Sequence, residues 1–165
     1  MKTRRLLVLV AVVTASVSLG GCMSAPQHSQ LDDYRTEAER LSGELIAAIP
    51  AELAGSTGML NSRMTLGADI SSHEGAGAPA WWSVDQSVTP APVANAARDA
   101  AAAMAAHLTA DGWTEKLVRA DDERTVDGFR KDGWYTEIAW YATVAGKAEA
   151  LDLAIVSPET VRGDH

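Results

Sequence analysis

"FRKDGWYTEIAWY", residues 129–141, is the stretch that decides the fold. Within it, Asp132-Gly133 separates two strand-like patterns, and an Asp-Gly pair between alternating apolar residues is the strongest short-range signal of a β-hairpin. The second strand is expected to continue to residue 145, and one of its faces is formed by Trp134, Thr136, Ile138, Trp140, Ala142 and Val144. The stretch therefore predicts two antiparallel strands whose shared apolar face lies in the core.

The chain on both sides of this hairpin continues the pattern of strand and turn. Residues 113–120 and 125–131 are expected to be strands on either side of a turn at residues 121–124. A turn at Gly146-Lys147 leads to a last strand over residues 149–156, whose core face consists of Leu151, Leu153 and Ile155. The second half of the chain is therefore predicted to be an antiparallel meander of four strands.

A helix is predicted immediately before the meander, within residues 89–112. Thr89 is a suitable N-cap, Pro90 or Pro92 suits the first turn, and Gly112 fits the C′ position. The apolar stripe of this helix consists of Val93, Ala97, Ala100, Met104 and Leu108. Because many of its residues are alanine, the helix can approach a sheet closely.

A second amphipathic helix is predicted over residues 31–49. Ser29 and Asp32 resemble a capping box at its start, and Pro50 ends it. Its apolar residues recur at helical spacing: Leu31, Tyr34, Ala38, Leu41, Leu45 and Ile49. The face that carries them should pack on the same core.

Two strands are predicted between the helices. The first, of about ten residues, ends near Leu66 and alternates apolar with polar positions. The second is WWSVDQSV, residues 81–88, which we expect to pair with the first. The order is therefore α-β-β-α-β-β-β-β, which predicts an α+β fold: an antiparallel sheet of about six strands with two helices packed on one face.

The N-terminal residues have the three regions of a signal peptide. Lys2, Arg4 and Arg5 precede an apolar run of 14 residues, from Leu6 to Leu19, which as a helix measures about 21 Å at roughly 1.5 Å per residue. That is too short to cross a hydrocarbon core of about 30 Å, so a permanent transmembrane helix is disfavoured.

The single cysteine, Cys22, follows Leu19-Gly20-Gly21, and this arrangement resembles the bacterial lipobox. The resemblance implies cleavage after Gly21 and attachment of diacylglycerol, with acyl chains such as palmitate, to the Cys22 thiol, a soft nucleophile. Two acyl chains anchor a protein stably, whereas one is marginal. The alternative is an ordinary secretory signal followed by a free thiol.

These features predict a division of the chain into four parts. Residues 1–21 are expected to be the lipoprotein signal peptide, 22–30 the lipidated N-terminus and tether, 31–158 a single α+β domain, and 159–165 a tail. The protein is expected on the cell membrane, anchored by lipid and facing the extracytoplasmic side.

Three segments of the second half, HLTADGWTEKL, FRKDGWYTEIAWY and LDLAIVSPE, resemble small lipoproteins of high-GC Gram-positive (actinobacterial) bacteria. In that family a helix ends in Asp-Gly-Trp, a second Gly-aromatic hairpin follows, and a Leu-rich strand closes with Ser-Pro. Many members continue with Cys, where this chain has Glu159. The family has no assigned activity, so the resemblance implies an envelope lipoprotein and provides no catalytic residue.

Charge excludes one class of partner. Without the three basic residues of the signal peptide, 11 of the 14 Lys and Arg residues remain against 22 Asp and Glu, a net charge of −11. Nucleic acid is therefore not an expected partner, since phosphate binding requires a basic surface. Anionic lipid is disfavoured for the same reason, so contact with the membrane is expected through the acyl chains on Cys22.

The sequence predicts no catalytic residue, no metal site and no cofactor. The four histidines, His28, His73, His107 and His165, are not at metal-ligand spacing. His73 is more simply part of a solvated loop, and His107 a partly buried structural residue. Residues 121–123, Asp-Asp-Glu, lack the spaced ligands of a calcium loop and suit a hairpin tip.

Trp81 is the candidate ligand-binding residue. In a strand, Trp81 and Trp82 must point to opposite faces of the sheet, so one ring can be in the core and the other exposed. An exposed tryptophan could contact an envelope protein or glycan, whereas a helix covering that face would bury it. The leading prediction is a non-enzymatic binding or interaction module.

Two other functions remain open. A cell-envelope hydrolase would require a deep pocket that unites at least two of the following residues: His73, Glu74, Asp85 and Asp99. A lipid carrier would require a large apolar cavity under the sheet.

Overall fold

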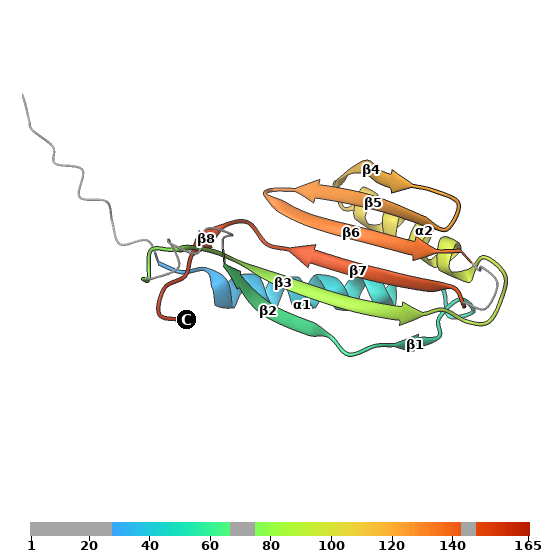
Figure 1. Cartoon of the computed structure of the whole chain (residues 1–165), viewed down its shortest axis with the longest axis horizontal. Coiled ribbons are helices and arrows are strands. Elements are labelled where there is room, and N and C mark those ends of the chain that lie inside the picture. Colours follow the sequence, from blue (N-terminus) through green and yellow to red (C-terminus); the bar gives the residue numbers. More distant parts are fainter. Residues whose placement is uncertain (1–27, 67–74, 143–147) are drawn as a thin grey trace, which may run out of the picture.

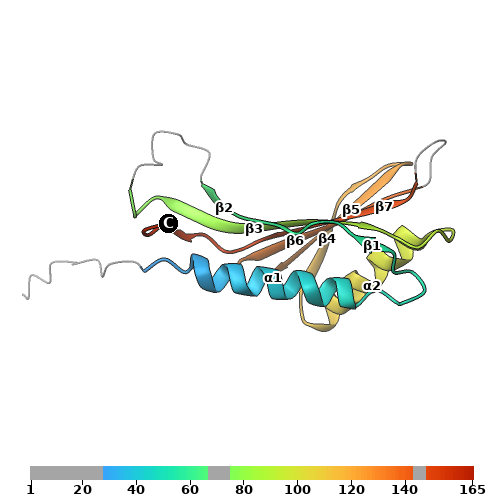
Figure 2. The same cartoon turned by 90° about the horizontal axis from the view of Figure 1, so that it is seen from below.

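The computed structural model describes residues 28–66, 75–142 and 148–165. It confirms the predicted α+β class: two helices lie against one side of an antiparallel sheet (Figures 1 and 2). The helices are α1 (Leu31–Ala47) and α2 (Ala96–Ala110). The strands are β1 (Ser56–Thr57), β2 (Asn61–Leu66), β3 (Pro79–Thr89), β4 (Thr114–Ala120), β5 (Arg124–Lys131), β6 (Trp134–Tyr141), β7 (Ala150–Val156) and β8 (Thr160–Val161).

The strand order of the sheet is β1-β3-β7-β6-β5-β4, and β2 and β8 also pair with β3. All pairs are antiparallel. The six long strands are those that the alternation predicts, and β2 pairs with β3 as expected, Met64 lying opposite Trp82. Helix α2 connects β3 to β4, which lies at the far edge of the sheet. The chain then returns through β5 and β6, and β7 lies between β6 and β3.

The Asp-Gly hairpin forms as predicted between β5 and β6. Asp132 has φ of 49° and Gly133 φ of 85°, and two positive φ angles in a two-residue loop are those of a type I′ turn. The twist of this turn matches the right-handed twist of the strands that it joins, so the local sequence fixes the register of β5 and β6.

The core lies between the sheet and the two helices. From the helices it receives Leu41 and Leu45 of α1 and Met104 and Leu108 of α2, and from the sheet Val84, Phe129, Ile138, Leu151, Leu153 and Ile155. Phe129, Met104 and Leu45 are fully buried. The predicted core face of β6 is confirmed at Thr136 and Ile138, which are also buried.

Helix α2 begins later than predicted. Thr89 is the last residue of β3 rather than an N-cap, and the helix starts at Ala96 with Asn95 as its N-cap. Val93, expected in the apolar stripe, is instead exposed before the helix. A distant carboxylate replaces the local cap: Glu149 accepts hydrogen bonds from the backbone N–H groups of Asn95 at 2.9 Å and Ala97 at 2.8 Å.

The C-terminal end of α2 agrees with the prediction. Gly112 has φ of +84° and stands at C′, directly after the C-cap Asp111. The Trp113 N–H donates to the Leu108 carbonyl, a bond that closes the end of the helix.

Three other details differ from the expectations. The N-cap of α1 is Gln30 and no side chain caps it, so the Ser29–Asp32 capping box is wrong. The strand predicted to end near Leu66 is found as β2 but is shorter than ten residues, and an additional two-residue strand, β1, precedes it. The residues expected as a tail include β8, which pairs with the start of β3.

Among the described residues, no helix is long and apolar enough to cross a membrane.

Candidate functional site

The side of the sheet away from the helices is the candidate site. Both described helices lie on the other side (Figure 2), so alternate strand residues face away from them. We call this side the open face. On the four central strands its residues are Trp81, Ser83, Asp85 and Ser87 of β3, Asp152, Ala154 and Val156 of β7, Tyr135, Glu137, Ala139 and Tyr141 of β6, and Arg124, Val126, Gly128 and Arg130 of β5.

The centre of the open face is made of small residues. Ala154 lies opposite Glu137, and Glu137 lies opposite Gly128, so one row across the sheet alternates between small and large side chains. A Cβ atom at Gly128 would lie 2.9 Å from both Tyr135 Oη and Val118 Cγ2. The glycine therefore lets these two side chains lie flat on the sheet.

Tyr135 forms one polar cluster of the open face. Its hydroxyl donates a short hydrogen bond to the Glu137 carboxylate, and the Arg130 guanidinium stacks 4.6 Å from the centre of its ring. Burial, together with the bond to Glu137, raises the pKa of Tyr135 to about 12. The phenol therefore stays protonated and holds Glu137 in place at neutral pH.

Tyr141 forms a second cluster with residues of two neighbouring strands. Arg124, directly opposite it on β5, stacks with its guanidinium carbon 5.1 Å from the ring centre. Burial, followed by the effect of the Asp152 carboxylate, raises the pKa of the Tyr141 phenol. The Ser87 hydroxyl donates to Asp152 at 2.7 Å, so this carboxylate is oriented by a neighbouring strand.

A hollow of about 270 Å³ lies between the two clusters. The open-face residues that line it are Asp85, Ser87, Arg124, Glu137, Ala139, Asp152 and Ala154. Asp85 at its border forms an ion pair with Arg63 of β2 at 2.8 Å. Each of the three carboxylates that line the hollow, Asp85, Glu137 and Asp152, therefore has a partner within the chain.

Arg124 differs from these carboxylates. Its Nε atom is buried and has no hydrogen-bond partner among the described residues. The stacked Tyr141 ring fixes the plane of the guanidinium at the border of the hollow. This one donor, Nε, is therefore buried without a partner in the described part of the chain, which is uncommon in folded proteins.

Trp81 lies on the open face, and no described helix covers it, but it is half-buried rather than fully exposed. The two tryptophans point to opposite faces, as alternation requires. Trp82 lies on the helix side, where its Nε1 donates to Ser62 Oγ at 2.8 Å and Arg35 stacks 5.7 Å from its ring centre. Trp81 does not line the hollow.

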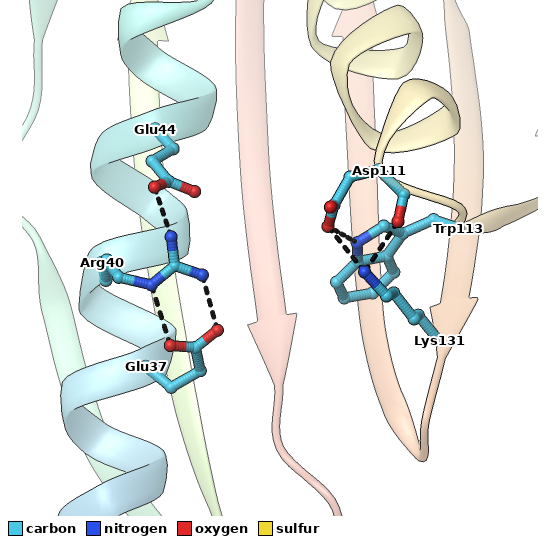
Figure 3. Close-up of polar contacts among 6 residues, drawn as sticks. All are labelled: Glu37, Arg40, Glu44, Asp111, Trp113 and Lys131. Atoms are coloured by element: carbon cyan, nitrogen blue, oxygen red, sulfur yellow. Dashed lines mark hydrogen bonds and ion pairs between the residues drawn. The ribbon is translucent and has the colours of Figure 1, made fainter.

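The helix side has a larger groove, between the C-terminal parts of α1 and α2 (Figure 3). It measures about 670 Å³, and its lining includes Arg40, Glu44, His107 and Asp111. His107 is exposed there, so its prediction as a partly buried residue is wrong.

The charges at this groove are neutralised by their own neighbours. Arg40 lies between Glu37 and Glu44 and forms ion pairs with both, which lower the pKa of Glu37 and raise that of Arg40. Lys131 binds the Asp111 carboxylate at 2.8 Å and lowers its pKa. The Arg40 pairs lie within α1, and the Lys131 contact ties the C-terminal end of α2 to β5.

Of the residues proposed for a hydrolase, the two that the structure describes are not brought together. Asp85 lies on the open face, whereas Asp99 lies on α2, on the opposite side of the sheet, beside Arg98. His73 and Glu74 lie outside the described residues, as do Gly21 and Cys22. Within the described part of the chain, no group of three or more His, Cys, Asp or Glu residues is placed to hold a metal ion.

Sequence reasoning missed the cluster around Arg124. Its residues come from β3, β5, β6 and β7. The Asp-Gly turn sets Arg124 opposite Tyr141, but the approach of Ser87 to Asp152 depends on the pairing of β3 with β7, which no local motif reveals. One signal was present: each central strand has at least one charged or aromatic residue at its non-core positions.

Comparisons with known proteins add little. No protein-family model and no curated protein matches the chain. Among solved structures, one described as a candidate lipoprotein, LppA from Mycobacterium tuberculosis, shares 15% sequence identity, with a TM-score of 0.37 over 79% of this chain and 75% of that chain. That neighbour is actinobacterial, as are the lipoproteins that the sequence resembles, and a TM-score this low carries no conclusion about this chain.

Proposed function

We propose that this protein is a lipid-anchored, extracytoplasmic binding module and that it recognises a component of the cell envelope through its open face. The observation that carries the proposal is the one-sided fold: both described helices cover one face of the sheet, while the other presents stacked Arg and Tyr side chains around a hollow. Tyr and Arg are the residues that most often dominate binding energy at interfaces.

The organisation of the open face supports recognition rather than catalysis. Its tyrosines and carboxylates are fixed by hydrogen bonds and stacking before any ligand arrives, which lowers the entropy lost on binding. Hydrolysis requires paired acid and base groups within reach of one reacting atom. No described pocket unites two of the residues expected for that chemistry.

The anchor is proposed from the sequence of the N-terminus, with Cys22 as the lipid-carrying residue. Residues 23–30 form a short tether, and its end lies next to β8, where the Gln30 N–H donates to Thr160 Oγ1 at 3.3 Å. At most about 3.3–3.6 Å per residue, a tether of this length holds the domain close to the bilayer.

Replacement of Cys22 tests the anchor. Cys22→Ala should move the protein from the membrane fraction to the soluble extracytoplasmic fraction, because the thioether that holds the acyl chains cannot form. Cys22→Ser is a second variant without the thiol and should behave in the same way. Fractionation of both variants like the wild type would refute the lipid anchor.

Photo-crosslinking in cells tests the open face. A benzophenone amino acid in place of Val118, which is 52% exposed and lies over Gly128, places the probe beside the two clusters. The same probe at Ala102, an exposed position on α2, is the matched control. An adduct with an envelope component from Val118 alone is the expected result. Equal adducts from both positions, or none from Val118, would refute recognition through this face.

A further inference from the structure

We infer that the hollow at Arg124 binds one residue of a neutral carbohydrate, a sugar of an envelope glycan. This inference rests on the proposed binding role of the open face and names its ligand. It follows from four properties of the hollow: its charge, its hydrogen-bonding groups, its size and its position on the sheet.

The charges around the hollow favour a neutral ligand. A cation would compete with Arg63 for Asp85, while Glu137 and Asp152 accept from the neutral hydroxyls of Tyr135 and Ser87. An anion attracted by Arg124 would lie beside the same three carboxylates. A neutral molecule avoids both costs.

The hydrogen-bonding groups favour hydroxyls. Arg124 lines the hollow and has donors only, whereas the carboxylates accept and have lone pairs left for further donors. A sugar hydroxyl both donates and accepts, so adjacent hydroxyls on one ring can satisfy Arg124 and a carboxylate together.

The lining and the size of the hollow suit a single ring. Ala139 and Ala154 form part of its lining and leave room for a ring between the charged side chains. A volume of about 270 Å³ is slightly below the roughly 300–1,000 Å³ of sites for drug-sized ligands, which corresponds to one small residue of a longer chain.

The position of the hollow disfavours an extended peptide. Peptides commonly bind a sheet by adding a strand to a free edge. Here β3, β7, β6 and β5 are each paired on both sides, so the backbone under the hollow has no free edge. A ligand at this place must be bound by side chains, as a sugar ring would be.

A glycan array probed with the full-length lipidated protein in detergent micelles tests the inference. The array carries neutral oligosaccharides, uronic-acid oligosaccharides and oligosaccharides with free amino groups. The protein should be retained by one or more neutral glycans. Arg124→Ala should weaken that retention by about tenfold or more, because hydrogen bonds from a charged donor are lost.

Two further variants keep the result interpretable. Ala154→Val fills the hollow without removing a hydrogen-bonding group and, since valine suits a strand, should fold while losing the same retention. Arg98→Ala removes an exposed arginine of α2, on the opposite side of the sheet, and should bind like the wild type.

The inference is overturned if no neutral glycan retains the protein, if Arg124→Ala and Ala154→Val bind as the wild type does, or if the uronic-acid oligosaccharides bind best. If the Val118 probe forms an adduct with an envelope protein and no glycan of the array retains the chain, the sugar ligand is refuted and the proposed function stands. Failure of both experiments would overturn both.

Discussion

The cap of α2 leads to a quantitative prediction about Glu149. Its carboxylate accepts from the N–H groups of Asn95 and Ala97, the first free donors of the helix. Asn95 is exposed, so water can replace the carboxylate there, but Ala97 is fully buried. Glu149→Ala therefore leaves one buried donor without a partner.

The expected loss of stability in Glu149→Ala is the sum of two contributions. A buried donor that loses its partner costs about 1–3 kcal/mol, and the lost charge at the helix N-terminus adds about 0.3–1 kcal/mol. We expect Glu149→Ala to lower the free energy of unfolding by about 2–3 kcal/mol. Glu149→Gln keeps one acceptor, which can serve the buried Ala97 N–H, and loses the charge and the bond to the exposed Asn95, so it should cost about 1 kcal/mol.

The assay is urea unfolding followed by tryptophan fluorescence, which is suitable because all five tryptophans lie in the described domain. For a slope of about 2 kcal/mol per molar urea, the midpoint should fall by about 1 M in Glu149→Ala. Glu52→Ala, an exposed carboxylate in a turn, is the control and should stay within about 0.5 kcal/mol of the wild type. The capping argument is refuted if Glu149→Ala unfolds at the same urea midpoint as Glu52→Ala.

The remaining predictions concern the Tyr135 cluster. Gly128→Ala places a methyl group 2.9 Å from Tyr135 Oη and should cost about 1–3 kcal/mol through overpacking, measured by the same unfolding assay; an unchanged midpoint would contradict the close packing. The pKa of Tyr135 is raised from about 10 to about 12, so the folded state holds the phenol proton more tightly than the unfolded state does. The protonated phenol therefore contributes fully to stability below about pH 10, and this contribution disappears between about pH 10 and 12. Tyr135→Phe should therefore lose less stability than the wild type over that interval, whereas parallel pH profiles would contradict the shift.

Local patterns predicted those parts of the fold that depend on periodicity. Alternation identified the core positions of β6 and β7, such as Ile138 and Leu153, and the Asp-Gly pair set one register. The start of α2 could not be found in the same way. Thr89 and Pro90 are good local start signals, but pairing with β1 keeps Thr89 in β3, and the cap comes from Glu149, far along the chain.

The candidate site was less predictable than the fold for a related reason. Trp81 could be assigned to a face from its neighbour alone, because alternation is local. The contacts of Arg124 with Tyr141, and of Ser87 with Asp152, join residues 17 and 65 positions apart. The first contact follows from the register that the Asp-Gly turn sets, whereas the second requires the pairing of β3 with β7, which the sequence pattern left open.

The position of β7 governs how this chain acquires its structure. It is the last long strand to be synthesised, yet it lies at the centre of the sheet, pairing with β3 on one side and β6 on the other. Until β7 arrives, α1 with β1–β3 and α2 with β4–β6 are two half-sheets with unpaired central edges, which are exposed to aggregation. Folding must therefore wait for contacts between distant residues, such as Ser83 with Val156, and such topologies fold slowly. A chain that ends before β7 lacks the strand that joins its two halves, so the C-terminal residues determine when the protein becomes a single cooperative unit.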